Sequence, residues 1–197
     1  MVATLYRAKP AFQRTLEPVV AALDRGGVSP DAVTWFGLAV AGGAGAVVAA
    51  ASLWSWLMWV IPALLLVRMS ANAVDGQLAR RTATSEHGAV LNEVTDVAGD
   101  AAAYLPFAAL AGSWAGWLVV GVVAIGMMAE VAAIAGDCPV RRNAGPLGKA
   151  DRALGFSLLA IAHAASAPAV LVTGGLALMV ALGLATVRNR LRQGGAD

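Results

Sequence analysis

Apolar residues dominate the chain and fall into long segments that polar residues interrupt at only a few places. Six segments are long enough to cross a hydrocarbon core of about 30 Å, and they lie at residues 33–53, 55–79, 88–112, 114–136, 152–170 and 171–188. Each segment is typical of a membrane-spanning helix. The pattern therefore predicts a bundle of six transmembrane helices over residues 33–188.

Residues 1–27 follow a different pattern. Leu16, Val19, Val20 and Leu23 recur at helical spacing, with charged residues between them. This arrangement predicts an amphipathic helix on the membrane surface, with an ordinary cytoplasmic helix as the alternative. Gly26 and Gly27 are expected to end it, and Ser29 and Pro30 are expected to open the first span.

Composition supports a membrane protein. Of the 197 residues, 59% are hydrophobic and 13% are charged, whereas a soluble domain carries about 25% charged residues. Mean hydropathy is +0.71. We therefore expect an all-α integral membrane protein with a single domain over residues 1–197, and we find no nucleic-acid-binding motif.

The basic residues indicate how the chain is oriented. Of the 14 Lys and Arg residues, all but Arg68 lie before the first span, after the second, around the start of the fifth or after the sixth. With six spans these four places share one side of the membrane. The positive-inside rule then puts both termini in the cytoplasm, for a multi-pass protein of the cell (inner) membrane. Near the opposite turns lie the aromatic residues expected at an interface: Trp54, Trp56, Trp59, Trp114 and Trp117.

Oxygen-bearing side chains interrupt the second and third spans between Asn72 and Asp100. Ionisable groups at membrane depth are costly, so their presence indicates function. On a helix, Asn72 and Asp75 share one face, while Asn92, Asp96 and Asp100 share another. Two such helices facing each other could bring four or five oxygens to one point, and Mg²⁺ or Mn²⁺ prefers such ligands.

Small residues and an arginine accompany these oxygens. Gly76, Ala79 and Gly88 have almost no side chain and leave room for a bulky ligand. Arg80 can hold a phosphate or pyrophosphate by a bidentate contact. The segment therefore predicts a phosphate-containing ligand beside the metal.

At these residues the chain resembles the CDP-alcohol phosphotransferases. The signature of that family is D-x2-D-G-x2-A-R-x(7 or 8)-G-x3-D-x3-D, and two of its four aspartates are asparagine here. The matching positions are Asn72, Asp75, Gly76, Ala79, Arg80, Gly88, Asn92 and Asp96, with Ser85 where the family usually has Ser or Thr.

The resemblance implies an activity in phospholipid synthesis. The family transfers a phosphatidyl or similar group from a CDP-alcohol, here first of all CDP-diacylglycerol, to a polar alcohol acceptor and releases CMP. By resemblance, Asp96 is the catalytic base. Asn72, Asp75, Asn92 and Asp96 surround Mg²⁺ or Mn²⁺, while the CDP-alcohol contacts are Thr34, Gly76, Ala79, Arg80, Ser85 and Gly88.

The basic segment at 137–151 adds an expectation about the acceptor. The family places acceptor contacts near this loop, which implies Lys149 and Arg152 as first choices and Arg141 and Arg142 as second choices. A loop that is basic only because it faces the cytoplasm is the alternative. Dimers are common in the family, so a homodimer is also an open expectation.

The two asparagines leave three functions open, because they remove two negative charges from the signature. The first is an active transferase with a modified metal site, in which Glu93 or Asp100 could take over a ligand position. The second is a relative that binds nucleotide-linked lipid or a partner protein without turnover. The third is a cation carrier that uses the buried acids as relay groups.

Three more polar residues lie within the spans. Arg68 needs a partner, and we expect a structural ion pair with Glu93, Asp100 or Glu130. Glu130 receives the same interpretation. His163 is expected to be a satisfied or cavity-facing histidine rather than a metal ligand.

Overall fold

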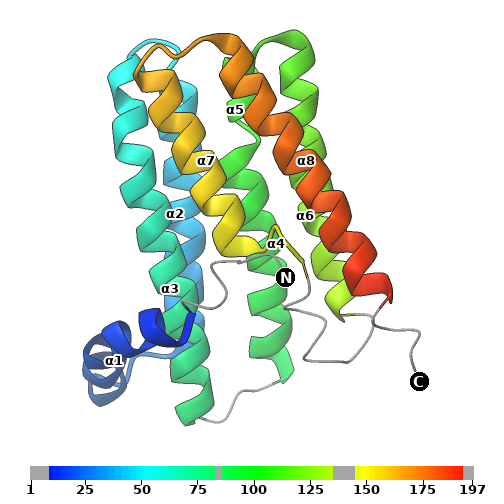
Figure 1. Ribbon diagram of the computed structural model, residues 1–197. Coiled ribbons are helices and arrows are strands. Elements are labelled where there is room, and N and C mark those ends of the chain that lie inside the picture. Colours follow the sequence, from blue (N-terminus) through cyan, green and yellow to red (C-terminus); the bar gives the residue numbers. More distant parts are fainter. Residues whose placement is uncertain (1–8, 83–85, 135–144, 193–197) are drawn as a thin grey trace.

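The computed structural model describes residues 9–82, 86–134 and 145–192, and helices follow one another through all three ranges (Figure 1). No strand occurs in these ranges, so the predicted all-helical class is confirmed. The elements are α1 (Lys9–Arg25), α2 (Pro30–Ala50), the 3₁₀ helix η2 (Ser55–Val60), α3 (Ile61–Thr82), α4 (Glu86–Tyr104), α5 (Phe107–Ala111), α6 (Ser113–Ile134), α7 (Lys149–Ala164) and α8 (Ala169–Arg192).

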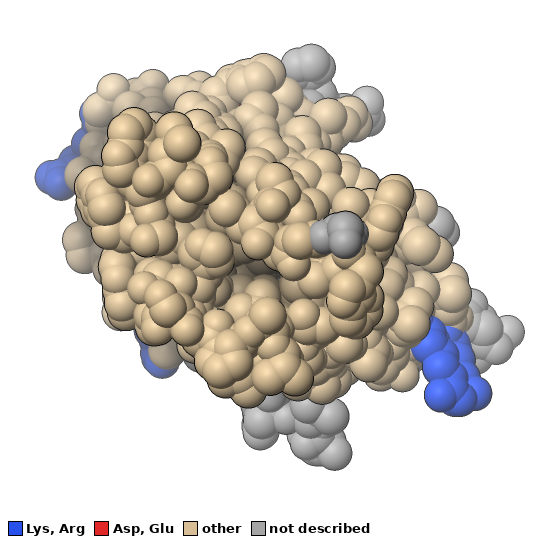
Figure 2. Space-filling model, turned by 90° about the horizontal axis from the view of Figure 1, so that it is seen from above, with Lys and Arg blue, Asp and Glu red and all other residues tan. Residues whose placement is uncertain are grey.

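The long helices alternate in direction. In Figure 1, α2, α4 and α7 rise from the lower end, while α3, α6 and α8 descend to it. The ends of α3 and α8 that carry basic residues therefore lie at the same end of the bundle, and α1 lies across that end beside α3. Figure 2 shows the opposite end as a surface of uncharged residues with a hollow near its centre, and basic residues appear only at its margins.

Four helical segments are long and apolar enough to cross a membrane. Among the described residues they are Pro30–Ala50, Ser55–Thr82, Trp114–Ala132 and Ala169–Arg192. The α4 helix contains several acids, and α7 has only 16 residues. The predicted count of six spans therefore stays a prediction for these two elements.

Two predicted boundaries are wrong. The third apolar segment is two helices, because the chain turns at Leu105 and Pro106 between α4 and α5. Proline removes a backbone donor and disfavours a helical preceding residue. The last two segments separate at residues 165–168, where Ser166 has a φ of 55°, rather than at residues 170 and 171.

The predicted helix ends around residues 25–30 are confirmed. The α1 helix ends at Arg25, and Gly27 follows with a φ of 67°, which glycine adopts without steric penalty. The Ser29 side chain accepts a hydrogen bond from the Ala32 N–H at 3.2 Å and so caps α2. This cap orients the first turns of α2, which contain Thr34.

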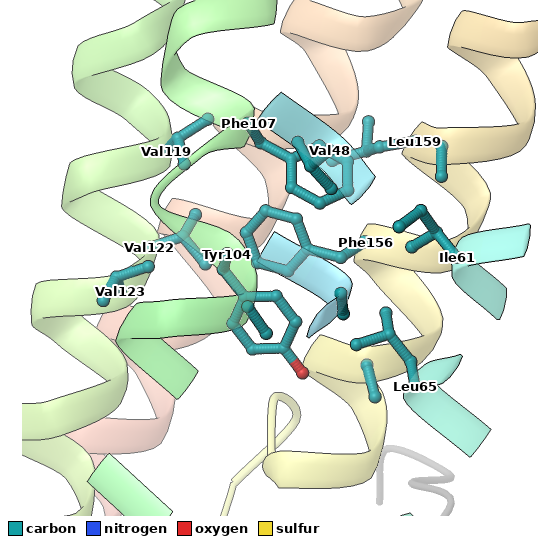
Figure 3. Packing of buried hydrophobic residues seen from close by; sticks show 14 of the residues in the cluster. Val48, Ile61, Leu65, Tyr104, Phe107, Val119, Val122, Val123, Phe156 and Leu159 are labelled. Atoms are coloured by element: carbon teal, nitrogen blue, oxygen red, sulfur yellow. The ribbon is translucent and has the colours of Figure 1, made fainter. Parts of the chain in front are cut away.

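The apolar core lies between the helices toward the end that is free of basic residues. Tyr104 stacks on Phe156 with ring centroids 4.2 Å apart, and Phe107 packs on the other side of Phe156 at 5.0 Å (Figure 3). A Cβ at Gly45 would lie 2.1 Å from the Ala102 carbonyl oxygen, so the α2 and α4 backbones touch there. Since α2 also packs on α3, it holds α3 and α4 in place relative to each other.

His163 lies in this apolar part of the molecule. It lines a small cavity together with Met58, Phe107, Leu159 and Leu176. The interpretation of His163 as a cavity-facing residue is confirmed.

Candidate functional site

Asn72 on α3 contacts Asp96 on α4, and Asp75 follows Asn72 on the same face of α3. The Asn72 side-chain amide donates to Asp96 Oδ1 at 2.7 Å. Both aspartates are buried, and the charge of Asp96 acts on the Asp75 carboxylate. Two of the four predicted metal ligands, Asn72 and Asp96, are therefore in direct contact, and Asp75 lies near enough to feel the charge of Asp96.

Thr34 of α2 joins the same group. Its hydroxyl lies 3.1 Å from Asp75 Oδ2 and 3.1 Å from the Pro30 carbonyl oxygen, and its single proton can be donated to one of them at a time. Thr34 is buried, so the contact with Asp75 is shielded from solvent. A residue that was predicted to contact nucleotide therefore also positions a carboxylate.

Lys149 enters the group from the start of α7. Its ammonium donates to Asp96 Oδ2 and lies 3.9 Å from Glu130 Oε2. The Gly148 N–H donates to Asp151 Oδ2 at 2.9 Å, which secures the first turn of α7. We define the candidate site as the five side chains that α2, α3, α4 and α7 bring together: Thr34, Asn72, Asp75, Asp96 and Lys149.

The predicted nucleotide contacts lie beside the site on α3 and α4. A Cβ built at Gly76 would meet only Arg80 Nη1, at 3.7 Å, so there is open space next to this glycine. Arg80 is exposed near the end of α3, and Ala79 and Gly88 are partly exposed. Ser85, Arg141 and Arg142 lie outside the described residues.

Asn92, the remaining predicted ligand, lies on α4. It is one helical turn before Asp96 on α4 and is partly exposed. Within the described ranges, no side-chain contact joins Asn92 to Asn72, Asp75 or Asp96. Its role as a ligand stays a prediction.

A second polar cluster lies one turn further along α4. Asp100 Oδ1 pairs with Arg68 Nη2 at 2.7 Å, and Asp100 Oδ2 pairs with Arg152 Nη2 at 2.7 Å. Glu130 Oε1 lies 3.4 Å from Arg152 Nη2 and 3.6 Å from Arg190 Nη1. The ion pair predicted for Arg68 is confirmed. We call these five buried residues the polar network: Arg68, Asp100, Glu130, Arg152 and Arg190.

Two glycines make room for the guanidinium groups of this network. A Cβ at Gly99 would lie 2.9 Å from Arg68 Nη2, and one at Gly126 would lie 3.1 Å from Arg152 Nε. Sequence reasoning missed the pairing of Asp100 with Arg152. Gly99 and Gly126, which lie close in sequence to Asp100 and Glu130, could have indicated that large side chains pack against α4 and α6 there.

Arg152 is the most deeply buried member of the network, with 1% of its surface exposed. Its Nη1 and the Tyr104 hydroxyl have no hydrogen-bond partner among the described residues. The structure thus places Arg152 in the protein interior, paired with acids. Its predicted contact with an acceptor stays a prediction.

The candidate site contains oxygen atoms of the chemical kind that binds hard divalent cations. Asp75 and Asp96 supply carboxylate oxygens, which Mg²⁺ and Mn²⁺ prefer. The Asn72 amide lies beside them, with its oxygen toward α2, where a Cβ at Gly37 would be 3.3 Å away. Half a turn of that amide would direct its oxygen to Asp96. The described residues contain no cluster of three or more His, Cys, Asp or Glu side chains suited to a metal.

Comparison with known proteins places the chain among inner membrane proteins. No protein-family model matches it. An uncharacterized protein of Aquifex aeolicus (strain VF5) is 37% identical over 107 residues, which are 53% of this chain and 50% of that protein. The inner membrane protein YnbA of Escherichia coli (strain K12) is 38% identical over 164 residues, which are 82% of this chain and 81% of that protein. This similarity and the apolar helices support an inner-membrane location. The chain belongs to the family of the inner membrane protein YnbA.

Proposed function

We propose that this protein is a metal-dependent transferase that moves a phosphatidyl group from a CDP-alcohol, first of all CDP-diacylglycerol, to the hydroxyl of a polar acceptor. One observation carries the proposal: Asn72 and Asp96, whose positions follow the transferase signature, are in contact across two helices, and the charge of Asp96 acts on Asp75. Open space beside Gly76 and the exposed Arg80 next to it suit a pyrophosphate.

The chain's own residues would share the work as follows. Arg80 binds the pyrophosphate by paired N–H donors. Asp96 accepts the proton of the acceptor hydroxyl. The oxygen of that hydroxyl bonds to the phosphatidyl phosphorus, and the bond between this phosphorus and the oxygen of CMP breaks. Thr34 holds the Asp75 carboxylate in place. Mg²⁺ or Mn²⁺, held by Asp75, Asp96 and the Asn72 amide, would neutralise charge on the leaving CMP.

The membrane topology forms part of the proposal. We infer six spans, with α4 and α5 together as the third and α7 as the fifth. The alternating directions of the helices support this count (Figure 1). Both termini then face the cytoplasm, α1 lies on that membrane surface, and the acyl chains of the substrate stay in the bilayer while its headgroup reaches Asp75.

Binding without turnover is the second candidate function. The observation that favours it is that both oxygens of Asp96 already accept hydrogen bonds, from Asn72 and from Lys149. A metal ion or an acceptor hydroxyl could reach this carboxylate only if one of these two donors moved away. On this alternative the site retains CDP-diacylglycerol, or a partner that carries it, and releases no CMP.

The two functions separate in one assay. Protein purified in detergent is given CDP-diacylglycerol, Mg²⁺ or Mn²⁺, and a panel of acceptors comprising glycerol phosphate, inositol phosphate, serine and other polar alcohols. We expect CMP release together with a new lipid detected by mass spectrometry. Asp96→Asn should slow release by about 10²–10⁴-fold, and Asp75→Asn should also stop it.

The matched control for both variants is Arg188→Gln, which removes a charge from an exposed position on α8. It should leave CMP release unchanged. Metal-dependent binding of CDP-diacylglycerol, with no CMP from any acceptor, would support the binding function and exclude the transferase.

A further inference from the structure

The contacts of the candidate site bear directly on how many cations it can hold. The question rests on the proposed function, because phosphoryl transfer can use one divalent cation or two that lie about 3.5–4 Å apart. A second cation needs further acceptor oxygens and further negative charge. The acids around the site differ in how many of their oxygens, and how much of their negative charge, are not already paired with a basic side chain.

Asp100 and Glu130 are already committed to arginine side chains. Each oxygen of Asp100 lies 2.7 Å from a guanidinium nitrogen, one of Arg68 and one of Arg152. Glu130 Oε1 lies between Arg152 and Arg190. A metal at either acid would leave a buried guanidinium without its partner, which is strongly unfavourable. Asp100 is therefore not available to replace a missing ligand.

Formal charges point the same way. Asp75 and Asp96 with Lys149 give the candidate site a charge of −1, and the three arginines and two acids of the polar network give it +1. One divalent cation changes the site from −1 to +1, which an anionic pyrophosphate can balance. A second would bring the site to +3, directly beside a network that is already positive.

The two oxygens of Asp96 differ in what a cation would meet there, because the neutral Asn72 amide at Oδ1 can turn to present its oxygen to a first cation, whereas the Lys149 ammonium at Oδ2 can only repel a second one. The Asn72 amide donates to Oδ1 at 2.7 Å, and the Lys149 ammonium donates to Oδ2. The ammonium is thus a compact positive charge at an oxygen that a second metal would need. Its side chain is 30% exposed and also approaches Glu130, so it lies where the candidate site and the polar network meet.

We propose that this site holds a single divalent cation, on Asp75 and Asp96, and that the Lys149 ammonium on Asp96 takes the place of a second one. The two asparagines and the lysine then form one consistent arrangement. The amides remove negative charge from positions 72 and 92, and the lysine supplies positive charge at Asp96. In this arrangement Lys149 is a positioning residue for Asp96.

The test measures metal binding by itself, without substrate or turnover. The full chain, purified in detergent, is titrated with Mn²⁺, and electron paramagnetic resonance counts the bound ions and shows whether they are coupled. We expect one Mn²⁺ per chain with the signal of an isolated ion. Lys149→Met should bind that ion at least about tenfold more tightly, since a nearby positive charge is gone.

A triple variant completes the design. Asn72→Asp with Asn92→Asp and Lys149→Met should bind two Mn²⁺ with a coupled signal. Arg188→Met, which removes a positive charge from an exposed position on α8, is the matched control and should bind Mn²⁺ like the unmodified protein. Lys149→Arg should also keep one ion at the original affinity, and Lys149→Gln is a second neutral replacement should the methionine variant not fold.

The possible results separate this inference from the proposed function. Two Mn²⁺ in the unmodified protein would overturn the single-cation inference and leave the transferase proposal standing. Unchanged affinity in both Lys149→Met and Lys149→Gln would overturn the role of the lysine. No Mn²⁺ binding by any variant would overturn the metal-dependent transferase itself.

Discussion

Asp96 and Asp100 are one turn apart on α4, yet they belong to two regions with different properties. Asp100, in the polar network, has a guanidinium nitrogen 2.7 Å from each oxygen, and both arginines are buried. Asp96, in the candidate site, is held by an amide and by a lysine whose side chain is 30% exposed. In the polar network, buried arginines occupy both oxygens of the aspartate. In the candidate site, one of the two partners of the aspartate is reached by solvent.

This difference shows how a helical bundle can carry ionisable groups at depth for two purposes. A buried ion pair adds little net stability, but removal of one partner is very unfavourable because the other charge stays buried. The polar network therefore joins α3, α4, α6, α7 and α8. The network thereby holds the helices that carry the site beside it, where a hydroxyl, an amide and an ammonium hold Asp75 and Asp96.

The same substitution in the two regions should give the largest contrast. Asp100→Asn leaves Arg68 and Arg152 buried without a full counter-charge, and we expect it to lower the free energy of unfolding by about 3–5 kcal/mol. Asp75→Asn weakens the hydrogen bond with Thr34 and should lower the free energy of unfolding by no more than about 1.5 kcal/mol. Denaturant unfolding of both variants in the same detergent measures the difference, and equal losses would contradict the distinction between the regions.

A pair of glycines sharpens the comparison. At Gly99 an added methyl would lie 2.9 Å from Arg68 Nη2, so Gly99→Ala should lower the free energy of unfolding by about 1–3 kcal/mol. At Gly76 the methyl would meet only Arg80 Nη1 at 3.7 Å, so Gly76→Ala should leave stability unchanged. On the proposed function it should instead raise the KM for CDP-diacylglycerol. Loss of stability in Gly76→Ala would show that the space beside this glycine is not open.

The sequence predicted the parts of the molecule that depend on local spacing. The helix cap at Ser29, the shared face of Asn72 and Asp75, and the need of Arg68 for a partner all follow from short-range rules. The choice among Glu93, Asp100 and Glu130 as that partner stayed open, because it depends on how the helices rotate and pack. Packing also decides which distant residues meet.

The position of Lys149 and the break at Pro106 are two features that the spacing of residues along the sequence did not predict. Lys149 is 53 residues from Asp96, and no local pattern shows that its ammonium lies on that carboxylate. The break between α4 and α5 falls within residues 101–112, which carry no charged residue, so hydropathy alone predicts one helix there. The position of Lys149 comes from tertiary packing, whereas the break follows from the local effect of Pro106 on the backbone, which a hydropathy pattern does not register.

The Thr34 hydrogen bond gives a smaller effect within the site. Thr34→Val removes the hydroxyl that lies 3.1 Å from Asp75 Oδ2 and keeps the side-chain shape. We expect a loss of about 0.5–1.5 kcal/mol in unfolding free energy and, on the proposed function, slower CMP release. Thr34→Ser retains the hydroxyl and should behave like the unmodified protein in both measurements. A deficit in the serine variant equal to that of valine would show that packing, and not the hydrogen bond, is what matters.

The smallest effect is expected where charges pair outside both regions. Arg81, at the end of α3, pairs with Glu17 and with Asp24 of α1, and these three side chains are substantially exposed. Because solvent and salt screen exposed pairs, Arg81→Gln should lower the free energy of unfolding by less than about 1 kcal/mol, and the difference should disappear in high salt. Arg81→Lys keeps the charge and is the matched control. A loss as large as that of Asp100→Asn would mean that α1 is held by charge rather than by Val20, which is fully buried against α3.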